Sequence, residues 1–273
     1  MPVFCKAVVY LLLASPAIAQ SQTFTKITIK PATSADPRNM RMQVLSNGDL
    51  IANSVPVIML LSYAYDVPVD PSPRLSSLPD WAIRERYDIE GKAIAKAISP
   101  TQDSDSRRRN QQEVRELLAD RFKLAIRVEN KKMSVYALTV ASSGPKLQKS
   151  AMTEKGCTFD TSTEGCHNFA PGFGHPLDAK AIDLDDLARY ISNWTDLPVV
   201  NRTSLRGLFT VQTEGWLPMR LPPPPPDAPP DVNPFAGLPT IFKVLTELGL
   251  ELSRQDDILS VYTVEHIARP ATN

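Results

Sequence analysis

Short segments with contrasting hydrophobic patterns follow one another along the chain and predict alternating strands and helices. Residues 24–31 mix apolar and polar positions as a partly buried strand does. Residues 42–51 carry Asn47-Gly48 between apolar flanks, which predicts a hairpin because both residues tolerate positive φ. The same criteria predict helices at residues 55–65, 105–118, 182–191 and 240–248, and strands at 86–90, 124–128, 135–140, 197–200, 208–212, 250–252 and 258–264.

Two pairs of these strands are expected to be hairpins. A polar turn at residues 130–132 is expected to join the strands at 124–128 and 135–140. The strands at 250–252 and 258–264 are expected to form a closing hairpin.

The two halves of the chain repeat one order of elements, which is helix, strand, helix, strand and strand. Residues 55–60 align with 182–187 in hydrophobic pattern, which places Leu60 and Leu187 in equivalent positions. The pattern therefore predicts an α+β protein made of two similar small αβ units in tandem, each a sheet backed by helices. The expected division is a signal peptide at 1–19, a first unit at 20–145, a connection at 146–180 and a second unit at 181–273 with a Pro-rich insertion at 218–239.

The first nineteen residues have the pattern of a cleaved secretory signal peptide. Lys6 precedes an apolar stretch at residues 7–14, and Ala17 and Ala19 form a small-residue cleavage site before Gln20. The apolar stretch is too short to anchor the chain in a membrane. A periplasmic or secreted protein is therefore expected.

Charge and composition argue against several classes of function. Thirty basic residues balance thirty acidic ones, so no net field attracts a nucleic acid. No apolar run reaches the roughly 18 residues of a membrane-spanning helix. Glycine is scarce at 11 residues and proline abundant at 25, which argues against Gly-rich phosphate loops. We therefore expect no cofactor, no nucleic-acid partner and no transmembrane segment in the mature chain.

The cysteines predict a disulfide. Removal of the signal peptide leaves only Cys157 and Cys166, and an even number of cysteines in an oxidising compartment favours a bridge. The alternative is a zinc site completed by His167 and His175. Structural zinc sites usually begin with a closer cysteine pair, and adjacent Cys166 and His167 do not easily face one ion, so no metal is expected.

Three charged or Pro-rich segments have two interpretations each. Arginines 107–109 could be a nucleic-acid patch, but three arginines alone favour a solvated helix face. Asp183, Asp185 and Asp186 could be metal ligands, but capping of the helix that follows is a sufficient explanation. Ten of the 22 residues at 218–239 are proline, which favours a looped-out insertion over a docking peptide.

Several longer stretches carry specific residue patterns, at residues 24–31 (FTKITIKP), 47–50 (NGDL), 78–89 (LPDWAIRERYDI), 116–124 (ELLADRFKL), 135–138 (VYAL), 144–147 (GPKL) and 197–200 (LPVV). These stretches resemble a known family, the soil-associated exported proteins of unknown function that form large paralogous sets in acidobacteria and related soil bacteria. The resemblance implies export and supplies no catalytic residues, and the fusion of some relatives to membrane-bound sensor peptidases points to sensing. This sequence departs from that family in its proline insertion and at residues 201–203.

The second half carries a further pattern at residues 182–188, 197–200 and 208–211. This pattern resembles the short periplasmic domains at the N-termini of secretins and TonB-dependent transducers. Those domains bind partner proteins, so the resemblance implies a binding role.

The sequence favours a non-enzymatic binding or interaction module over an enzyme. No Gly-x-Ser-x-Gly or His-Glu-x-x-His motif is present, so no catalytic residue is assigned. An exported hydrolase that uses an acidic pair remains the alternative. The expected partner is an envelope protein or polymer, bound at sheet edges and around Trp81 with its neighbours Asp80 and Arg84.

Overall fold

The computed structural model describes most of the chain as two lobes. It covers residues 24–94, 106–220 and 233–271, apart from 35, 37–38, 46, 70–71, 155–156, 158 and 161–165. The predicted signal peptide and most of the Pro-rich insertion lie outside the described residues. Strands and helices are mixed in both lobes, which confirms the predicted α+β class.

The first lobe is built on a five-stranded sheet with the order β1-β5-β3-β2-β8. Its hydrophobic core includes the fully buried Leu60, Ile89, Leu117 and Phe122. Helix α1 is apolar on nearly all sides because it is enclosed by the sheet and by α3. The elements of this lobe are β1 (Phe24–Pro31), β2 (Arg41–Val44), β3 (Leu50–Pro56), β5 (Arg86–Ala93), β8 (Phe159–Asp160), α1 (Val57–Tyr65), α2 (Asp80–Arg84) and α3 (Ser106–Arg121).

The hairpin predicted at Asn47-Gly48 is confirmed. β2 and β3 pair in antiparallel register from Arg41 opposite Asn53 to Val44 opposite Leu50. Gly48 has a φ of 90°, which glycine adopts without strain. The turn therefore fixes the register of the two strands.

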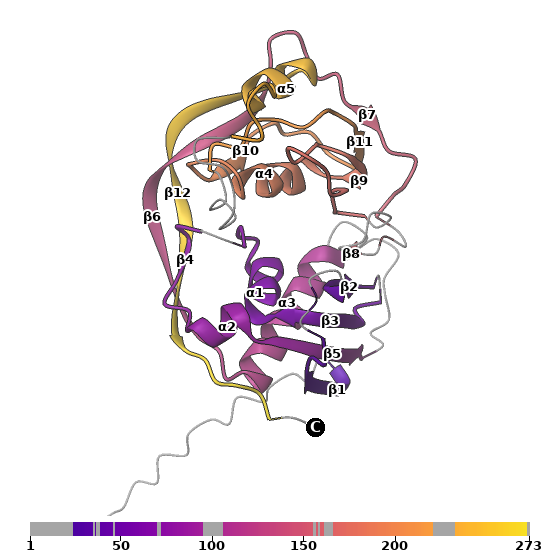
Figure 1. The fold of residues 1–273 in the computed structure, drawn as a ribbon, viewed down its shortest axis with the longest axis vertical. Coiled ribbons are helices and arrows are strands. Elements are labelled where there is room, and N and C mark those ends of the chain that lie inside the picture. The colour runs from indigo at the N-terminus through magenta and orange to yellow at the C-terminus, as the bar shows by residue number, and fades with distance from the viewer. Residues whose placement is uncertain are drawn as a thin grey trace, which may run out of the picture.

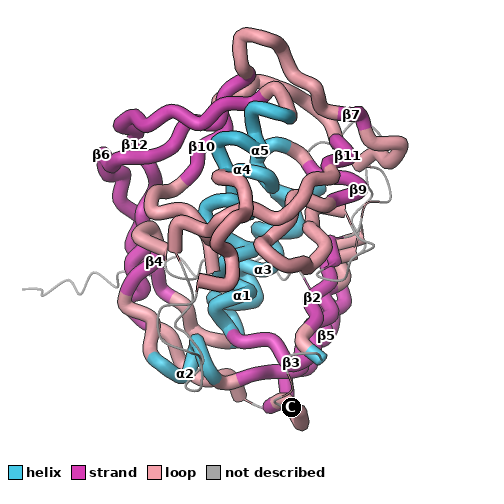
Figure 2. Tube along the Cα trace, turned by 45° about the horizontal axis from the view of Figure 1, so that its top comes forward, coloured by secondary structure: helices cyan, strands magenta, loops and turns pink. Residues whose placement is uncertain are grey.

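The second lobe contains a three-stranded sheet with the order β7-β11-β9 and a separate core. Trp216, Leu187 and Leu245 are fully buried in that core. Its elements are β7 (Gln148–Lys149), β9 (Ala179–Ile182), β10 (Val199–Asn201), β11 (Phe209–Val211), α4 (Leu184–Ser192) and α5 (Ile241–Glu247). Figure 2 shows α1, α3, α4 and α5 along the middle of the molecule, with strands on both sides.

A long two-stranded ribbon connects the lobes along one side of the molecule (Figure 1). β6 (Ala125–Val140) and β12 (Leu250–His266) pair in antiparallel register over their whole length. Leu138 and Leu252 enter the second core, whereas Ile126 packs against the first. Short β4 (Leu75–Ser76) runs parallel to β12, and β10 runs parallel to β6.

The two hairpins predicted at residues 124–140 and 250–264 are wrong, because one continuous strand of the ribbon runs through each segment. Residues 130–132 lie inside the continuous strand β6, and residues 250–264 lie inside the continuous strand β12. The middle of each strand is exposed, so its polar residues face solvent. This exposure gives a strand the polar composition that is typical of a turn.

The predicted disulfide between Cys157 and Cys166 is present, with the two Cα atoms 5.6 Å apart. It lies in the predicted connection, whose β8 joins the first sheet while β7 joins the second. No helix in the described part of the chain is both long and apolar enough to cross a membrane.

Candidate functional site

Helix α4 begins with a reciprocal capping box. The side chain of Asp183 accepts a hydrogen bond from the backbone N–H of Asp186 at 2.7 Å. The backbone N–H of Asp183 donates to the carboxylate of Asp186 at 3.1 Å. Asp185 instead points outward and accepts from Asn201 Nδ2 at 2.9 Å. Capping therefore accounts for the positions of Asp183 and Asp186.

The carboxylate of Asp186 is fully buried and is surrounded by three cationic side chains. His167 Nδ1 lies 2.6 Å from Oδ2, while Arg107 Nη1 and Arg189 Nη2 lie 2.9 and 2.8 Å from Oδ1. Burial favours the neutral acid, but Arg107 and His167 hold the pKa of Asp186 well below its ordinary value. Asp186 therefore stays ionised within the protein.

Charged groups from both lobes meet around Asp186. Arg107 of α3 also contacts Asp183 Oδ2 at 3.2 Å and Asp66 Oδ1 at 3.1 Å. Arg189 of α4 reaches back to the first lobe, with its Nε 3.1 Å from Asp66 Oδ1. Each lobe thus places an arginine against an aspartate of the other lobe. Glu154 joins this group through its contact with His167. We use the name interlobe ion network for these seven residues: Asp66, Arg107, Glu154, His167, Asp183, Asp186 and Arg189.

The prediction that arginines 107–109 form a solvated helix face is wrong for Arg107. Only 18% of the Arg107 side chain is exposed, whereas Arg108 is exposed. The first turn of α3 is directed toward α4 in the folded chain, and the sequence does not show this packing. Carboxylates of Asp66, Asp183 and Asp186 compensate the buried guanidinium.

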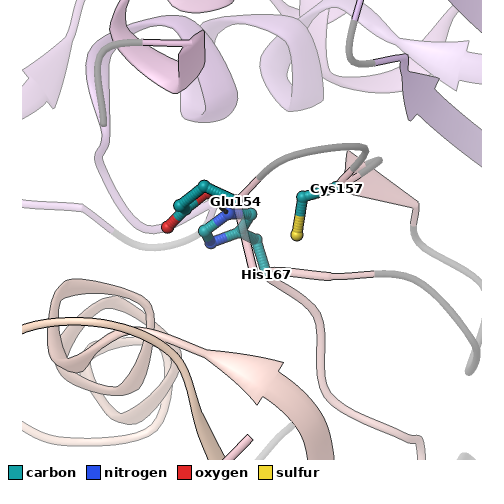
Figure 3. Close-up of side chains that lie close together, drawn as sticks. All are labelled: Glu154, Cys157 and His167. Carbon is teal, nitrogen blue, oxygen red and sulfur yellow. Dashed lines mark hydrogen bonds and ion pairs between the residues drawn. The ribbon is translucent and has the colours of Figure 1, made fainter. Parts of the chain in front are cut away.

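His167 bridges two carboxylates. Its Nε2 lies 3.1 Å from Glu154 Oε2, opposite the contact between Nδ1 and Asp186. Figure 3 shows Glu154, Cys157 and His167 close together, between ribbon segments of the two lobes. Burial alone would lower the pKa of His167, but Asp186 and Glu154 outweigh it and raise this pKa to about 9. His167 is therefore a cation at neutral pH.

Asp183 titrates at a different pH from its capping partner. Burial, together with the negative charge of Asp186, raises the pKa of Asp183 to about 6. Arg107 Nη1 lies within 3.2 Å of both carboxylates, so the pair is joined by one guanidinium group.

The ion network does not provide a suitable donor set for a metal ion. Cys157 is bonded to Cys166, and His175 stacks on Trp194 with ring centroids 3.5 Å apart. His167, Asp183 and Asp186 have ligand atoms close together, but two guanidinium groups already lie against Asp186. A divalent cation would be repelled by these positive charges.

An open cleft of about 150 Å³ lies beside the ion network. Met42 and Met59 of the first lobe line it together with Phe169 and Tyr190, and His167, Arg189 and Asn193 contribute polar groups. The rings of Phe169 and Tyr190 stack with centroids 4.0 Å apart. We call this space the interlobe cleft.

A family match covers the residues of this site. Residues 58–267 match the model of a family described as Protein of unknown function (DUF3738). The chain belongs to the DUF3738 family. The matched region of this DUF3738 chain contains the whole ion network and every cleft residue named above except Met42. No curated protein and no protein of solved structure matches the chain.

The three residues predicted from the sequence to bind a partner lie elsewhere on the DUF3738 chain. Asp80, Trp81 and Arg84 belong to α2, at the end of the first lobe away from α4 (Figure 1). Trp81 is half-buried against the first core, and the Arg269 guanidinium lies 5.1 Å from its ring centroid. Asp80 and Arg84 are exposed. The binding role predicted for these three residues stays a prediction.

Sequence reasoning missed the ion network of the DUF3738 chain. Asp66, Arg107 and Asp186 are far apart in the sequence and come together only when the lobes pack. The available signals were the arginine run and the acidic first turn of α4, and each had a sufficient local explanation. Asp186 does cap α4, so its position in the sequence gave no sign that it also contacts charged groups of the other lobe.

Proposed function

We propose that the protein is an exported binding module that holds a ligand in the interlobe cleft and does no covalent chemistry. The observation that carries this proposal is a cleft between two lobes whose lining is mostly apolar and includes a few polar groups. Ligand sites are commonly concave, mostly apolar and located between domains. The ion network supports the proposal because it fixes α4 and α3 beside the cleft before any ligand arrives.

The alternative of an exported hydrolase with an acidic pair has less support. Asp183 and Asp186 are a perturbed pair, which is a feature of acid–base sites. Glycoside hydrolysis needs two carboxyl groups on opposite sides of a substrate, roughly 5 to 9.5 Å apart. Here carboxylate oxygens of Asp183 and Asp186 lie within 4.8 Å of each other, and both carboxylates contact Arg107 Nη1.

Export to the periplasm or the exterior is part of the proposal. The signal-peptide pattern before Gln20, the resemblance to exported soil-bacterial proteins and the disulfide support it. N-terminal sequencing of exported protein should give Gln20 as the first residue, and an intact Met1 would contradict export by cleavage.

We also propose that the two lobes are related units in tandem, as the hydrophobic pattern predicts. Helices α1 and α4 each follow a strand and precede a short strand that runs parallel to a ribbon strand. Leu60 and Leu187, the aligned positions, are both fully buried. The resemblance of the second half to periplasmic partner-binding domains adds support for a binding role.

A contact with an envelope protein or polymer would connect ligand binding to sensing. The exposed side of α2 presents Asp80 and Arg84, and Ile83 beside them is 42% exposed. In the described part of the chain, β1 pairs only with β5, which leaves an edge for an added strand. This surface is separate from the interlobe cleft.

The proposed function is tested by recovering ligands from a natural source. Purified protein is incubated with envelope extract of its own host and re-isolated, and the bound molecules are identified by mass spectrometry. Wild type and the surface control Phe173→Ser, at a residue 64% exposed and outside the cleft lining, should retain the same molecule, and Met59→Lys should lose it. Equal retention by all three proteins would contradict binding in the cleft. Turnover of a peptide, ester or glycan panel that depends on Asp183 would favour the hydrolase.

A further inference from the structure

We propose that the ligand of the interlobe cleft is a small neutral molecule with a largely apolar surface. This inference rests on the proposed function and specifies its ligand class. It follows from the side chains that form the cleft walls, from the pairing of nearby charges, from the hydrogen bonds already made by polar groups, and from the size of the cleft.

The cleft walls are apolar and adaptable. Half-buried Met59 offers a flexible, polarisable thioether chain, which adjusts to apolar ligands of differing shape. Met42, only 1% exposed, extends this apolar wall into the first core. Phe169 and Tyr190 also line the cleft as a stacked pair. Burial raises the pKa of Tyr190 to about 12, so its ring remains an uncharged phenol at neutral pH.

The charged groups beside the cleft already have partners of opposite sign. Arg189 contacts Asp186 and Asp66, and His167 contacts Asp186 and Glu154. An ionic ligand would have to displace one of these contacts and lose its own hydration. The pairing therefore disfavours both anions and cations.

Polar groups on the cleft also make hydrogen bonds within the protein. The Ser62 hydroxyl donates to the carbonyl of Val67 at 2.6 Å. Asn193 Oδ1 accepts from the backbone N–H of Val69 at 3.1 Å, and its Nδ2 donates to the carbonyl of Arg189. A ligand rich in hydroxyl groups, such as a sugar, needs several free polar partners when it is buried. Ser62 and Asn193 already make hydrogen bonds within the protein, which favours an apolar ligand.

The size of the cleft favours a small molecule. Its volume of about 150 Å³ is below the roughly 300 to 1,000 Å³ that is usual for sites of drug-sized ligands, so only a small molecule or part of one can be enclosed. A folded partner could place only a side chain in this space, and such a partner would still need a docking surface around it.

The test uses two fluorescent probes that share one aromatic skeleton. N-phenyl-1-naphthylamine is neutral, and 1-anilinonaphthalene-8-sulfonate differs from it by an anionic sulfonate. Each probe is titrated into the purified protein, and the dissociation constant and stoichiometry are measured. The neutral probe should bind saturably with one molecule per chain, about tenfold or more tightly than the anionic probe.

Two variants locate the probe. Met59→Lys places a charge in the cleft and should weaken binding of the neutral probe by about tenfold or more. Phe173→Ser removes an exposed ring, 64% accessible and outside the cleft lining, and should leave binding unchanged. If Met59→Lys does not fold, Tyr190→Lys at a partly exposed position of α4 replaces it, and folding is checked by circular dichroism.

The outcomes separate the ligand class from the binding function. Tighter or equal cleft binding of the anionic probe would overturn the neutral class while leaving a binding cleft in place. Binding of neither probe, or binding that Phe173→Ser abolishes and Met59→Lys does not, would overturn the neutral apolar class. In that case, recovery of a natural ligand that Met59→Lys loses would still support the proposed function.

Discussion

At the scale of single residues, Asp186 joins the two lobes through charge. One of its oxygens caps α4 and contacts His167, and the other contacts Arg107 and Arg189. The side chain is fully buried, so each of these contacts replaces hydration that the carboxylate lost on folding. The stability of the network should therefore depend strongly on this residue.

Asp186→Ala should reduce the free energy of unfolding by about 3 to 5 kcal/mol, because it leaves buried cations without their shared partner. The matched control is Asp185→Ala, on the exposed side of the same helical turn. That control should change the free energy by about 1 kcal/mol or less. Urea denaturation followed by circular dichroism measures both. If the two variants lose the same free energy of unfolding, Asp186 contributes nothing to stability beyond helix capping.

The pKa of His167 predicts how stability changes with pH. This pKa rises from 6.5 in the unfolded chain to about 9 in the folded protein, so folding favours the protonated ring. The stabilisation is complete below pH 6.5 and is lost as the pH rises through about 9. We expect a decrease of about 1 to 3 kcal/mol over this window.

His167→Gln provides the control for this pH dependence. The variant should be less stable at pH 6.5 and should show a much flatter dependence between pH 6.5 and 9. The groups that face the ring are Asp186 of α4, Glu154 of the connection and Arg107 of α3. An unchanged slope in the variant would show that another group titrates in this window.

At the scale of elements, the sequence predicts local structure well where the pattern is local. The strand at 24–31 and the hairpin at Asn47-Gly48 are confirmed because their signals lie within a few residues. Residues 130–132 misled the prediction, because a solvent-exposed ribbon has the same polar composition as a turn. The ion network could not be predicted, because Asp66, Arg107 and Asp186 meet only through packing of the lobes.

A cross-strand cysteine pair tests the continuous ribbon. Asn130 lies opposite Ser260, and the Ser260 hydroxyl donates to Asn130 Oδ1 at 3.2 Å. The double variant Asn130→Cys, Ser260→Cys should therefore form a disulfide under oxidising conditions. The control pair Asn130→Cys, Gln255→Cys is out of register by five residues and should keep two free thiols. Free thiols in both pairs, measured after denaturation, would favour a turn at 130–132.

At the scale of the whole molecule, the ribbon and the ion network connect the same two lobes at different places. The ribbon brings each lobe a strand segment from the other half of the chain. Leu138 of β6 enters the second core, and the ring of Tyr262 of β12 lies against Tyr65 of α1 in the first lobe, with ring centroids 4.9 Å apart. The network joins α3 to α4 beside the cleft. These two connections leave a cleft whose walls come from both lobes, and the central claim is that this cleft binds a ligand.

Nuclear magnetic resonance of methionine methyl groups tests this claim most directly. Met42 and Met59 line the cleft, whereas Met152 is 41% exposed and Met133 lies on the ribbon, so one labelled sample contains both site and control signals. On titration with N-phenyl-1-naphthylamine, the signals of Met42 and Met59 should shift together and saturate, while those of Met133 and Met152 stay in place. Unchanged Met42 and Met59 signals, or shifts confined to Met133 and Met152, would contradict ligand binding in the interlobe cleft.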